Sequence, residues 1–400
     1  MKLYIFNLDS DLALADDTDN YIPPAPVRRM MEDLALLPVW YAQPCSAVLA
    51  PSAYNADYLK QLKEWFSLDT TLITEPELPD YADVQVMPWG WNKTLRKRLL
   101  RLGLMEGRLP SLTTLIGYRI CSSRVQVAEL SKVFRSFPIG KSRYVCGRHQ
   151  VLSKADDDSL RAVENEYKET GFVLKSVLSG SGRGLRWCRH GMSPSDVNWC
   201  RREWQMNGSV LVEPIYNKVE DFAMEFYSDG QGKVAFMGYS LFLTDEKGVY
   251  RSNLLMSDEE VECRLRQYIP LQVLVEVREQ MEWGLAEVFG TAYTGPLGVD
   301  MMVCGGQPKY PQYVIHPHVE VNLRRTMGML AHEWTTRFLP VGVCGEFRMD
   351  SFPTTEDLCR QHRQDMEAHP LVVQDGKLLS GYLPLVPITP KSRYRAYVLV

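Results

Sequence analysis

The residues with the clearest chemical potential lie between Ile315 and Arg324, where polar and apolar side chains alternate. Alternate side chains of a β-strand point to opposite faces. One face would be apolar, and the other would carry five polar side chains: His316, His318, Glu320, Asn322 and Arg324. Such a row is costly to bury unless it lines a wet cavity or binds a charged ligand. A solvent-facing strand with accidental alternation is the alternative.

The polar row contains oxygen ligands next to a guanidinium group. Glu320 and Asn322 offer a carboxylate and a carboxamide two residues apart, which suits Mg²⁺, a cation that prefers oxygen ligands and retains substrate phosphates in its shell. Arg324 adds a planar fork of donors for phosphate. The two histidines permit a zinc interpretation, but it is weak without an evident fourth ligand. Each histidine is better explained as a polar core residue or a substrate contact.

A second acidic residue interrupts the apolar run Gly298–Val303 at Asp300. An unpaired buried carboxylate is costly, so a neighbouring strand that carries Glu320 and Asn322 would give it a shared cation. These three side chains form a predicted site for one or two Mg²⁺ ions.

A lysine and a glycine-rich loop form a candidate phosphate-binding segment. Lys175 interrupts an apolar strand, so its ammonium group needs an anionic partner. The loop that follows contains Ser179, Gly180, Ser181, Gly182 and Gly184. Backbone N–H groups of such a loop can approach phosphate oxygens closely. The spacing matches neither a Walker A loop nor a dinucleotide-binding fingerprint, and a plain hairpin turn is the alternative.

A further candidate segment would contact the rest of a nucleotide. The apolar strand Val210–Ile215 carries Glu213 near its end, and the acids Glu220 and Asp221 follow. Acids in these places can hydrogen-bond to an adenine edge and a ribose diol, although surface strands often end in glutamate.

Taken in order, these segments resemble the ATP-grasp superfamily. The order is a strand lysine before a glycine-rich loop, an apolar strand ending in glutamate, a strand aspartate, and Glu-x-Asn with arginine beyond. The resemblance covers residues 115–330 and is strongest from Val319 to Arg324. It implies two α+β subdomains that grip ATP between them, preceded by an α/β domain on the substrate side.

The resemblance also implies roles at the nucleotide. Lys175 would contact the α- and β-phosphates, and the 179–184 loop would fold over the triphosphate. Glu213 would lie at the adenine, with Ile215 lining the adenine pocket. Asp221 would hold the ribose, in preference to the acid before it.

The remaining implied roles concern metal and phosphoryl transfer. Asp300, Glu320 and Asn322 would bind Mg²⁺, and Arg324 would act catalytically by steadying the transferring phosphoryl group. Members of the superfamily also place an earlier lysine on the phosphates. This sequence offers Arg124 there, and whether it takes that role stays open.

The elements that position these residues alternate between strands and helices at the start of the chain, which is typical of an α/β domain. We expect strands at 2–6 and 47–49 and helices at 27–36, 54–65 and 95–102 in an N-terminal domain of residues 1–114. A first ATP-grasp subdomain would cover 115–206, a second 207–345, and a C-terminal helix and β-hairpin extension 346–400. Helices are expected at 120–135, 156–170, 271–289 and 354–367, and strands at 172–177, 209–215, 222–228, 233–243, 297–303, 313–323 and 396–400, with a hairpin turn at Asp375-Gly376.

The amino-acid composition limits the kinds of partner that we expect for this protein. A net charge of −4 gives no footprint for nucleic acid. No apolar run approaches the roughly 20 residues of a membrane helix, and acidic residues appear before a signal-peptide core could form. We therefore expect a cytoplasmic protein without membrane contacts. The nine cysteines are scattered singly with no CxxC pair, so we expect free thiols.

The function implied by the resemblance is an ADP-forming ligase that uses ATP and Mg²⁺. A small-molecule or peptide carboxylate would attack the γ-phosphate, and an amine or thiol would then displace phosphate. Two alternatives remain: a phosphotransferase on the same fold that acts on a hydroxyl, and a nucleotide-binding protein without turnover. The turns at 20–24 and 88–91 would approach the substrate, although aromatic residues such as Trp89 more often serve packing.

Overall fold

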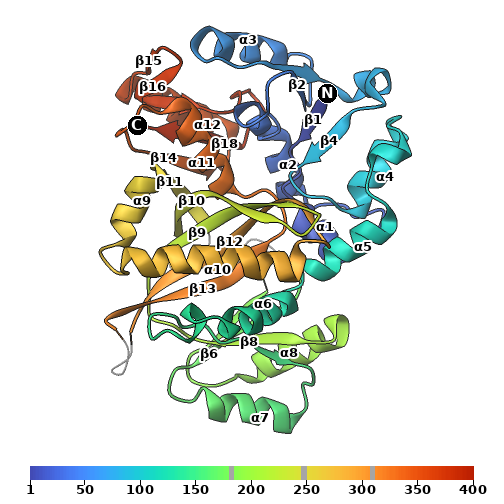
Figure 1. Ribbon diagram of the computed structural model, residues 1–400. Helices are drawn as coiled ribbons and strands as arrows, with labels where there is room; N and C mark the ends of the chain where they lie inside the picture. Colours follow the sequence, from blue (N-terminus) through green and yellow to red (C-terminus); the bar gives the residue numbers. More distant parts are fainter. Residues whose placement is uncertain (180–183, 245–249, 307–310) are drawn as a thin grey trace.

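The chain forms an N-terminal parallel sheet with helices, a large antiparallel sheet and a small antiparallel sheet, arranged from top to bottom in Figure 1. The computed structural model describes residues 1–179, 184–244, 250–306 and 311–400. Gly180, Ser181 and Gly182 of the expected phosphate loop therefore lie outside the described residues. The expected fold class, an α/β N-terminal domain followed by α+β units, is confirmed.

The N-terminal sheet has the strand order β3-β2-β1-β4, with parallel neighbours. Its strands are β1 (Lys2–Ile5), β2 (Ser46–Leu49), β3 (Thr70–Ile73) and β4 (Gln85–Pro88), and its helices are α1 (Ser10–Asp16), α2 (Ala25–Asp33), α3 (Asn55–Trp65) and α4 (Lys93–Arg101). Leu3 and Ile5 pack on one face, and Tyr4 and Phe6 pack on the other. Burial on both faces explains why β1 reads as a continuous apolar run.

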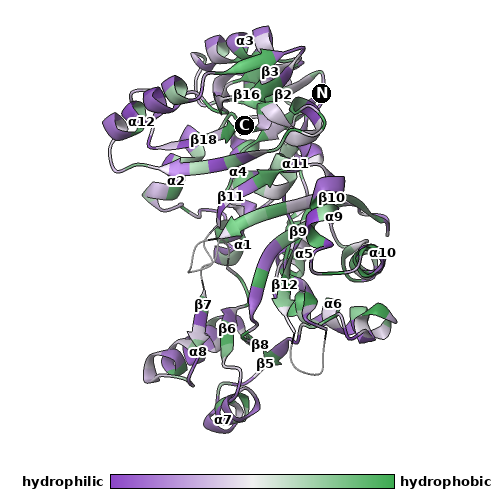
Figure 2. Ribbon diagram, turned by 90° about the vertical axis from the view of Figure 1, so that its left-hand side faces the viewer, coloured by the Kyte–Doolittle hydropathy of each residue, from purple (hydrophilic) through white to green (hydrophobic). Residues whose placement is uncertain are grey.

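The small sheet has the order β5-β8-β6-β7 and is antiparallel. It consists of β5 (Gln150–Leu152), β8 (Val210–Pro214), β6 (Phe172–Ser176) and β7 (Leu185–Cys188), with helices α7 (Asp157–Glu166) and α8 (Pro194–Asn207) packed on it. Figure 2 shows this unit below the large sheet, with hydrophilic residues prominent on both helices. The unit carries Lys175 and Glu213 on adjacent strands.

The large sheet has the order β13-β12-β9-β10-β11-β14-β18-β17, and its paired strands are antiparallel. Its strands are β9 (Lys218–Asp229), β10 (Val234–Thr244), β11 (Tyr250–Leu255), β12 (Thr294–Gly305), β13 (Tyr313–Asn322), β14 (Gly345–Ser351), β17 (Tyr382–Pro384) and β18 (Tyr394–Leu399). Helices α9 (Asp258–Leu265) and α10 (Leu271–Phe289) pack on β10, and α10 also packs on β9; both helices share one apolar core with β9, β10, β12 and β13. The opposite face of these strands therefore carries their polar side chains.

The helix expected over 120–135 is interrupted. The structure instead contains α5 (Leu112–Cys121) and α6 (Val125–Ser136), separated by Ser122–Arg124. The backbone N–H of Arg124 donates to the carbonyl of Val177 (2.8 Å), a partner outside either helix. The break places Arg124 beside the segment that follows Lys175.

The C-terminal region contains the expected helix, α12 (Thr355–Ala368), and the expected hairpin, β15 (Val372–Gln374) and β16 (Lys377–Ser380). Asp375 and Gly376 connect the hairpin with positive φ angles of 49° and 73°, as a tight two-residue turn requires. Strands β14, β17 and β18 also complete the large sheet, so this region packs as more than an added extension. The four-part division of the chain stays a prediction.

A long-range core joins the two ends of the chain. Trp40 packs against Trp334 and Phe338 of α11 (Met327–Phe338), in one cluster with Val398 of β18. Within the described ranges, no helix has the length and apolar character needed to cross a membrane.

Candidate active site

The three predicted metal ligands meet on the polar face of β12 and β13. Asp300 is the direct cross-strand partner of Glu320, and Asn322 lies opposite Gly298. The Asn322 carboxamide donates a hydrogen bond from Nδ2 to Asp300 Oδ2 (3.2 Å). The register of two neighbouring strands therefore brings together residues about twenty positions apart in sequence.

Electrostatics at this site favours a bound cation. Burial and the neighbouring carboxylates of Glu320 and Glu225 raise the pKa of Asp300 from 3.8 to about 8. Burial likewise raises the pKa of Glu225 to about 7, although Thr326 and Ser240 donate hydrogen bonds to it. Acids held this closely repel one another when ionised, and a divalent cation would relieve that repulsion.

Arg324 lies at the end of the same row and connects it to the N-terminal unit. Its Nη2 donates to Asn322 Oδ1 (2.9 Å), and its Nε donates to Asp11 Oδ2 of α1 (2.7 Å). Burial alone would lower the pKa of Arg324, but Asp11 raises it overall. The backbone N–H of the next residue, Arg325, donates to Trp89 O (2.9 Å).

The expected substrate-side turn at 88–91 therefore lies beside the arginine pair. Trp89 itself is fully buried and packs edge-on against Phe6, so its indole serves the core. Gly90 lies close to Ser10 and Arg324, since an added Cβ would lie 2.6 Å from Ser10 Oγ and 3.3 Å from the Cβ of Arg324.

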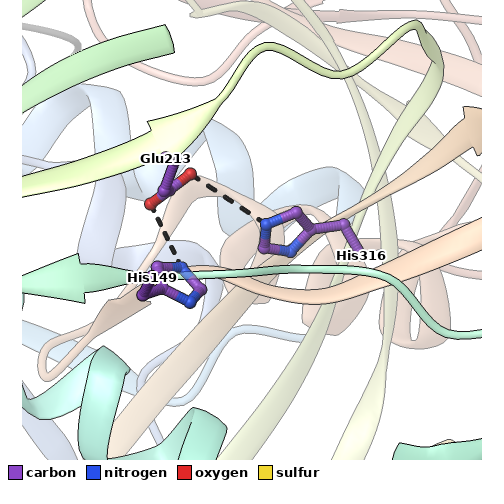
Figure 3. A group of neighbouring side chains, drawn as sticks. All are labelled: His149, Glu213 and His316. Carbon is purple, nitrogen blue, oxygen red and sulfur yellow. Dashed lines mark ion pairs between the residues drawn. The ribbon is translucent and has the colours of Figure 1, made fainter. Parts of the chain in front are cut away.

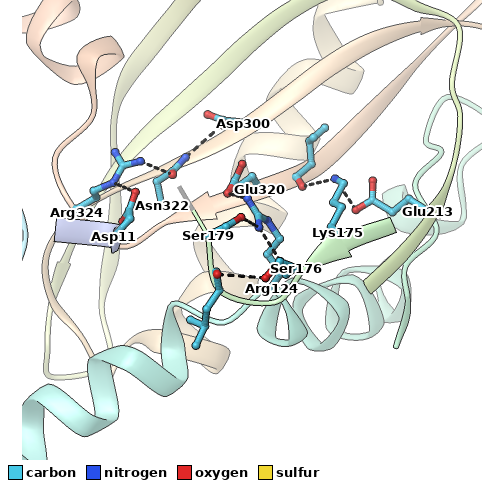
Figure 4. Close-up of polar contacts among 12 residues, drawn as sticks. Asp11, Arg124, Lys175, Ser176, Ser179, Glu213, Asp300, Glu320, Asn322 and Arg324 are labelled. Atoms are coloured by element: carbon cyan, nitrogen blue, oxygen red, sulfur yellow. Dashed lines mark hydrogen bonds and ion pairs between the residues drawn. The ribbon is translucent and has the colours of Figure 1, made fainter. Parts of the chain in front are cut away.

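Arg124 connects the segment that follows Lys175 with Glu320, one of the predicted metal ligands. Its Nη2 donates to Glu320 Oε1 (2.5 Å), and its Nη1 donates to Ser179 Oγ (2.6 Å) and Ser176 O (2.7 Å). The side chain is 4% exposed. Figure 4 shows these groups in one row, from Asp11 and Arg324 at one end to Lys175 at the other.

Lys175 and Glu213 pair with each other across β6 and β8. Lys175 Nζ lies 2.7 Å from Glu213 Oε1 and donates to Val319 O of β13 at 3.4 Å. Burial alone would raise the pKa of Glu213, but Lys175 and His149 hold it well below its usual range. The anionic partner that the sequence required for Lys175 is thus a neighbouring strand acid in this structure.

The ends of the glycine-rich loop are close together. Ser176 N–H donates to Gly184 O (2.8 Å), and Gly184 has φ +72°. A Cβ at Gly184 would lie 2.9 Å from both Ser176 Cβ and Ser179 Oγ. Glycine is therefore required here for both backbone conformation and space.

The two candidate ribose ligands, Asp221 and Glu220, lie on opposite faces of β9. Asp221 lies on the polar side of β9 with Ala223 and accepts from Thr244 Oγ1 (2.9 Å). Glu220 points to the side of α9, where Arg264 Nε donates to it (2.6 Å). Ile215 follows β8 directly, with its N–H donating to Gly171 O (3.1 Å). This geometry supports the preference for Asp221 over Glu220.

Sequence reasoning did not assign a role to Asp11, His149 or Glu225. Glu225 had a visible signal, because it is the one acid among the apolar residues of the stretch Phe222–Phe226. Asp11 and His149 carry no local pattern and reach the site through tertiary packing.

Three histidine rings form a cluster beside Glu213, the ion-pair partner of Lys175. His316 and His318 extend the polar row of β13, and His149 packs against both, with ring centroids 5.4 and 5.0 Å away. Burial lowers the pKa of His316 to about 3 and that of His318 well below its usual value. Both rings are therefore neutral at physiological pH.

No family model matches this sequence, and no curated protein matches it. Solved structures match by fold. A biotin carboxylase from Campylobacter jejuni, solved as a complex with ATP, aligns with a TM-score of 0.51 at 10% identity over 100% of this chain and 86% of that chain. An N5-carboxyaminoimidazole synthetase from Staphylococcus aureus with ADP gives 0.49 at 10% identity over 89% and 92% of the two chains. An N5-carboxyaminoimidazole ribonucleotide synthetase from Thermus thermophilus gives 0.48 at 12% identity over 100% and 93%.

The fold likeness to the biotin carboxylase extends over the whole chain, and Lys175 of the small sheet reaches Val319 O of β13, the strand that carries the polar row. This chain has the fold of the ATP-grasp superfamily.

Proposed function

We propose that this protein is an ATP-dependent, Mg²⁺-using ligase of the ATP-grasp type. It would activate a carboxylate as an acyl phosphate for attack by an amine or thiol, with release of ADP and phosphate. The observation that most directly supports this proposal is the shared face of β12 and β13. Asp300, Glu320 and Asn322 lie together on it, with Arg324 at their end. The same fold in a biotin carboxylase solved as a β,γ-ATP complex supports ATP as the nucleotide substrate.

The residues fit a hard cation. Asp300, Glu320 and Asn322 offer oxygen ligands only, which Mg²⁺ prefers while retaining phosphate oxygens in its shell. Bound Mg²⁺ would neutralise charge on the phosphates. The raised pKa of Asp300 gives this site a physical reason to bind a cation, because the ion would stabilise the ionised carboxylate.

The cationic side chains around this face would position the triphosphate and the phosphoryl group. Lys175 and Arg124 approach from the small-sheet side, and Arg324 approaches from the opposite end of the row. In phosphoryl transfer the protein acts chiefly by positioning and charge neutralisation. No side-chain nucleophile is required, and Arg324 would stabilise charge on the group in transit.

We propose that Arg124 takes the place of the early phosphate-binding lysine that the resemblance implies. It is buried, contacts the loop residue Ser179, and reaches the metal-side acid Glu320. A guanidinium group in this place can bind phosphate oxygens in a bidentate manner.

The carboxylate substrate would enter from the N-terminal unit. Arg324 Nε is held by Asp11 Oδ2 at 2.7 Å, and a substrate carboxylate has the same chemistry as the Asp11 side chain. We propose that the substrate competes with or lies beside this contact, with Gly90 allowing close approach.

The test is ADP release from ATP, measured with panels of carboxylates, amines and thiols. The proposal predicts ADP formation that requires a carboxylate, loss of activity by more than about a hundredfold in Asp300→Asn, and unchanged activity in the exposed-site control Asp80→Asn. ADP release that depends on an alcohol alone would identify a phosphotransferase instead. Nucleotide binding without turnover across the panels would leave a binding protein.

A further inference from the structure

A buried cluster of histidines and one carboxylate lies next to the proposed nucleotide site. His149 precedes β5, Glu213 lies near the end of β8, and His316 lies on β13. Their side chains point toward one another (Figure 3), and one ligand atom from each lies within 4.8 Å of the others. His149 Nε2 is 3.1 Å from Glu213 Oε1, and His316 Nε2 is 4.0 Å from Glu213 Oε2.

The ring nitrogens of His149 and His316 lack hydrogen-bond partners among the described residues. The side chains of His149 and His316 have no exposed surface, and Glu213 is 2% exposed. Five buried ring nitrogens among the described residues of the cluster and its neighbour accept or donate no hydrogen bond: His149 Nδ1 and Nε2, His316 Nδ1 and Nε2, and His318 Nδ1. Glu213 Oε1 lies 3.1 Å from His149 Nε2 and is paired by charge with Lys175 Nζ at 2.7 Å. Each unpaired buried group costs about 1–3 kcal/mol, so a ligand that satisfies several of them at once would stabilise the fold.

The backbone conformation at Gly147 leaves space for the histidine rings to lie close together. Gly147 has φ +107°, and an added Cβ would lie 3.1 Å from Cε1 of both His316 and His318. The N–H of Cys146 donates to Ile315 O (2.8 Å), which ties the segment before His149 to β13. The three ligands thus come from separate segments that the fold clamps together.

We propose that His149, Glu213 and His316 form a second metal site, for a transition-metal dication of the Zn²⁺ type. Two imidazoles and one carboxylate are a ligand set used for zinc, with the fourth position left to water or substrate. Tetrahedral zinc with ligands at about 2.0–2.2 Å requires the widest pair here to close by roughly 1 Å. Nitrogen ligands distinguish this site from the oxygen-only set at Asp300, which suits Mg²⁺.

Lys175 competes with the metal for the same carboxylate. Its Nζ is 2.7 Å from Glu213 Oε1, the oxygen that also faces His149. An ammonium group this close repels a dication, so removal of its charge should tighten zinc binding. This expectation is opposite to that for a purely structural cluster, in which loss of the Lys175–Glu213 pair would only weaken the fold.

One consequence rests on the proposed function. Phosphates that draw Lys175 away from Glu213 would free the carboxylate for the metal, so ADP and zinc should strengthen each other's binding. Because linkage is reciprocal, the same factor should appear in the ADP affinity when zinc is present.

The experiment is titration of the EDTA-treated, desalted full chain with Zn²⁺ against a chromophoric chelator, in excess Mg²⁺ and without nucleotide. We expect one equivalent of zinc per chain. Affinity should fall by more than about a hundredfold in Glu213→Gln and in His316→Gln, since loss of an outer-shell partner alone costs about 10- to 100-fold. It should be unchanged in the exposed control His190→Gln, and it should rise at least about tenfold in Lys175→Met.

The outcomes separate the alternatives. Circular dichroism of each variant establishes folding, and His149→Gln serves as a third ligand variant if one of the others fails to fold. Zinc binding that survives all three substitutions but is lost in Asp300→Asn would place the metal at the carboxylate site and overturn the proposal. Co²⁺ is bound to the chain in place of Zn²⁺ and its absorption spectrum is recorded. A sulfur-to-metal charge-transfer band would show that the thiols Cys146 and Cys304 are ligands, and would overturn the proposed ligand set.

The link to nucleotide is tested separately. Absence of zinc binding, together with weaker ADP binding in His316→Gln, would assign the histidines to the nucleotide pocket and refute the metal site. If ADP leaves the zinc affinity unchanged, the metal site stands. That result would refute only the coupling between zinc and the nucleotide through Lys175.

Discussion

Replacing Asp300 by asparagine in the metal-free protein should change how stability depends on pH. The folded protein raises the pKa of this carboxyl from 3.8 to about 8, chiefly through burial and then through Glu320 and Glu225. Between those two values the folded chain keeps a proton that the unfolded chain has released. The free energy of unfolding of the wild type must therefore fall as pH rises through this window.

The size of the effect follows from the same pKa. One retained proton lowers the free energy of unfolding by at most ~1.4 kcal/mol per pH unit. Asp300 is half-buried rather than sealed, so screening by water reduces this figure, and we expect a total of about 1–3 kcal/mol between pH 5 and 8. Asparagine keeps the acceptor for Asn322 but cannot ionise, so the stability of the variant relative to the wild type should rise by this amount between pH 5 and pH 8.

Urea denaturation in EDTA at four pH values from 5 to 8 measures this difference. Asp80→Asn, at an exposed position, is the matched control and should follow the wild-type curve. Saturating Mg²⁺ should restore the wild type at pH 8 and leave Asp300→Asn nearly unchanged, because the variant lacks a ligand charge. Parallel pH curves for the wild type and Asp300→Asn would refute the reasoning.

Three further variants test the geometry of the site. Gly184→Ala should destabilise the protein by about 1–2 kcal/mol in urea denaturation, because the residue has φ +72° and a Cβ would meet Ser176; Gly107→Ala, which meets open space, is its control. Gly328→Ala should cost about 1–3 kcal/mol, since a Cβ would overlap Glu225 Oε1. Arg324→Lys should lower kcat for ADP release by about 10²-fold or more with the fold intact, because a point charge cannot replace the guanidinium fork.

Each of these has a contradicting result. Equal stability of the two alanine variants at 184 and 107 would show that the loop ends do not need glycine. An unchanged free energy of unfolding in Gly328→Ala would mean that Glu225 moves freely beside α11. An unchanged kcat in Arg324→Lys would remove the assigned catalytic role.

Local patterns predicted the elements with strong periodicity. The apolar stripe of α10 and the alternation of β13 depend only on nearby residues, and both elements lie where the sequence indicated. The grouping of Asp300, Glu320 and Asn322 was also foreseeable, because a lone acid in one apolar strand and a Glu-x-Asn pair in the next meet when the strands pair in register. The hairpin at Asp375 followed from turn chemistry alone.

Features that depend on tertiary contacts were not foreseeable. At the break between α5 and α6, the N–H of Arg124 donates to the carbonyl of Val177, more than fifty residues away. The pairing of Lys175 with Glu213 and the approach of His149 depend on how β6 and β5 pair with β8 within the small sheet. Propensity over a short window carries no information about such contacts.

The measurement that bears most directly on the central claim is thermal unfolding with Mg²⁺ alone, with Mg·ADP, with Mg·ATP and with ATP plus EDTA. A ligand that binds only the folded chain adds about 2.7 kcal/mol at a hundredfold excess over its Kd. We expect a clear rise in Tm with Mg·ATP that shrinks in EDTA and in Lys175→Met but persists in the exposed control Lys168→Met. No rise in Tm at millimolar nucleotide would contradict it.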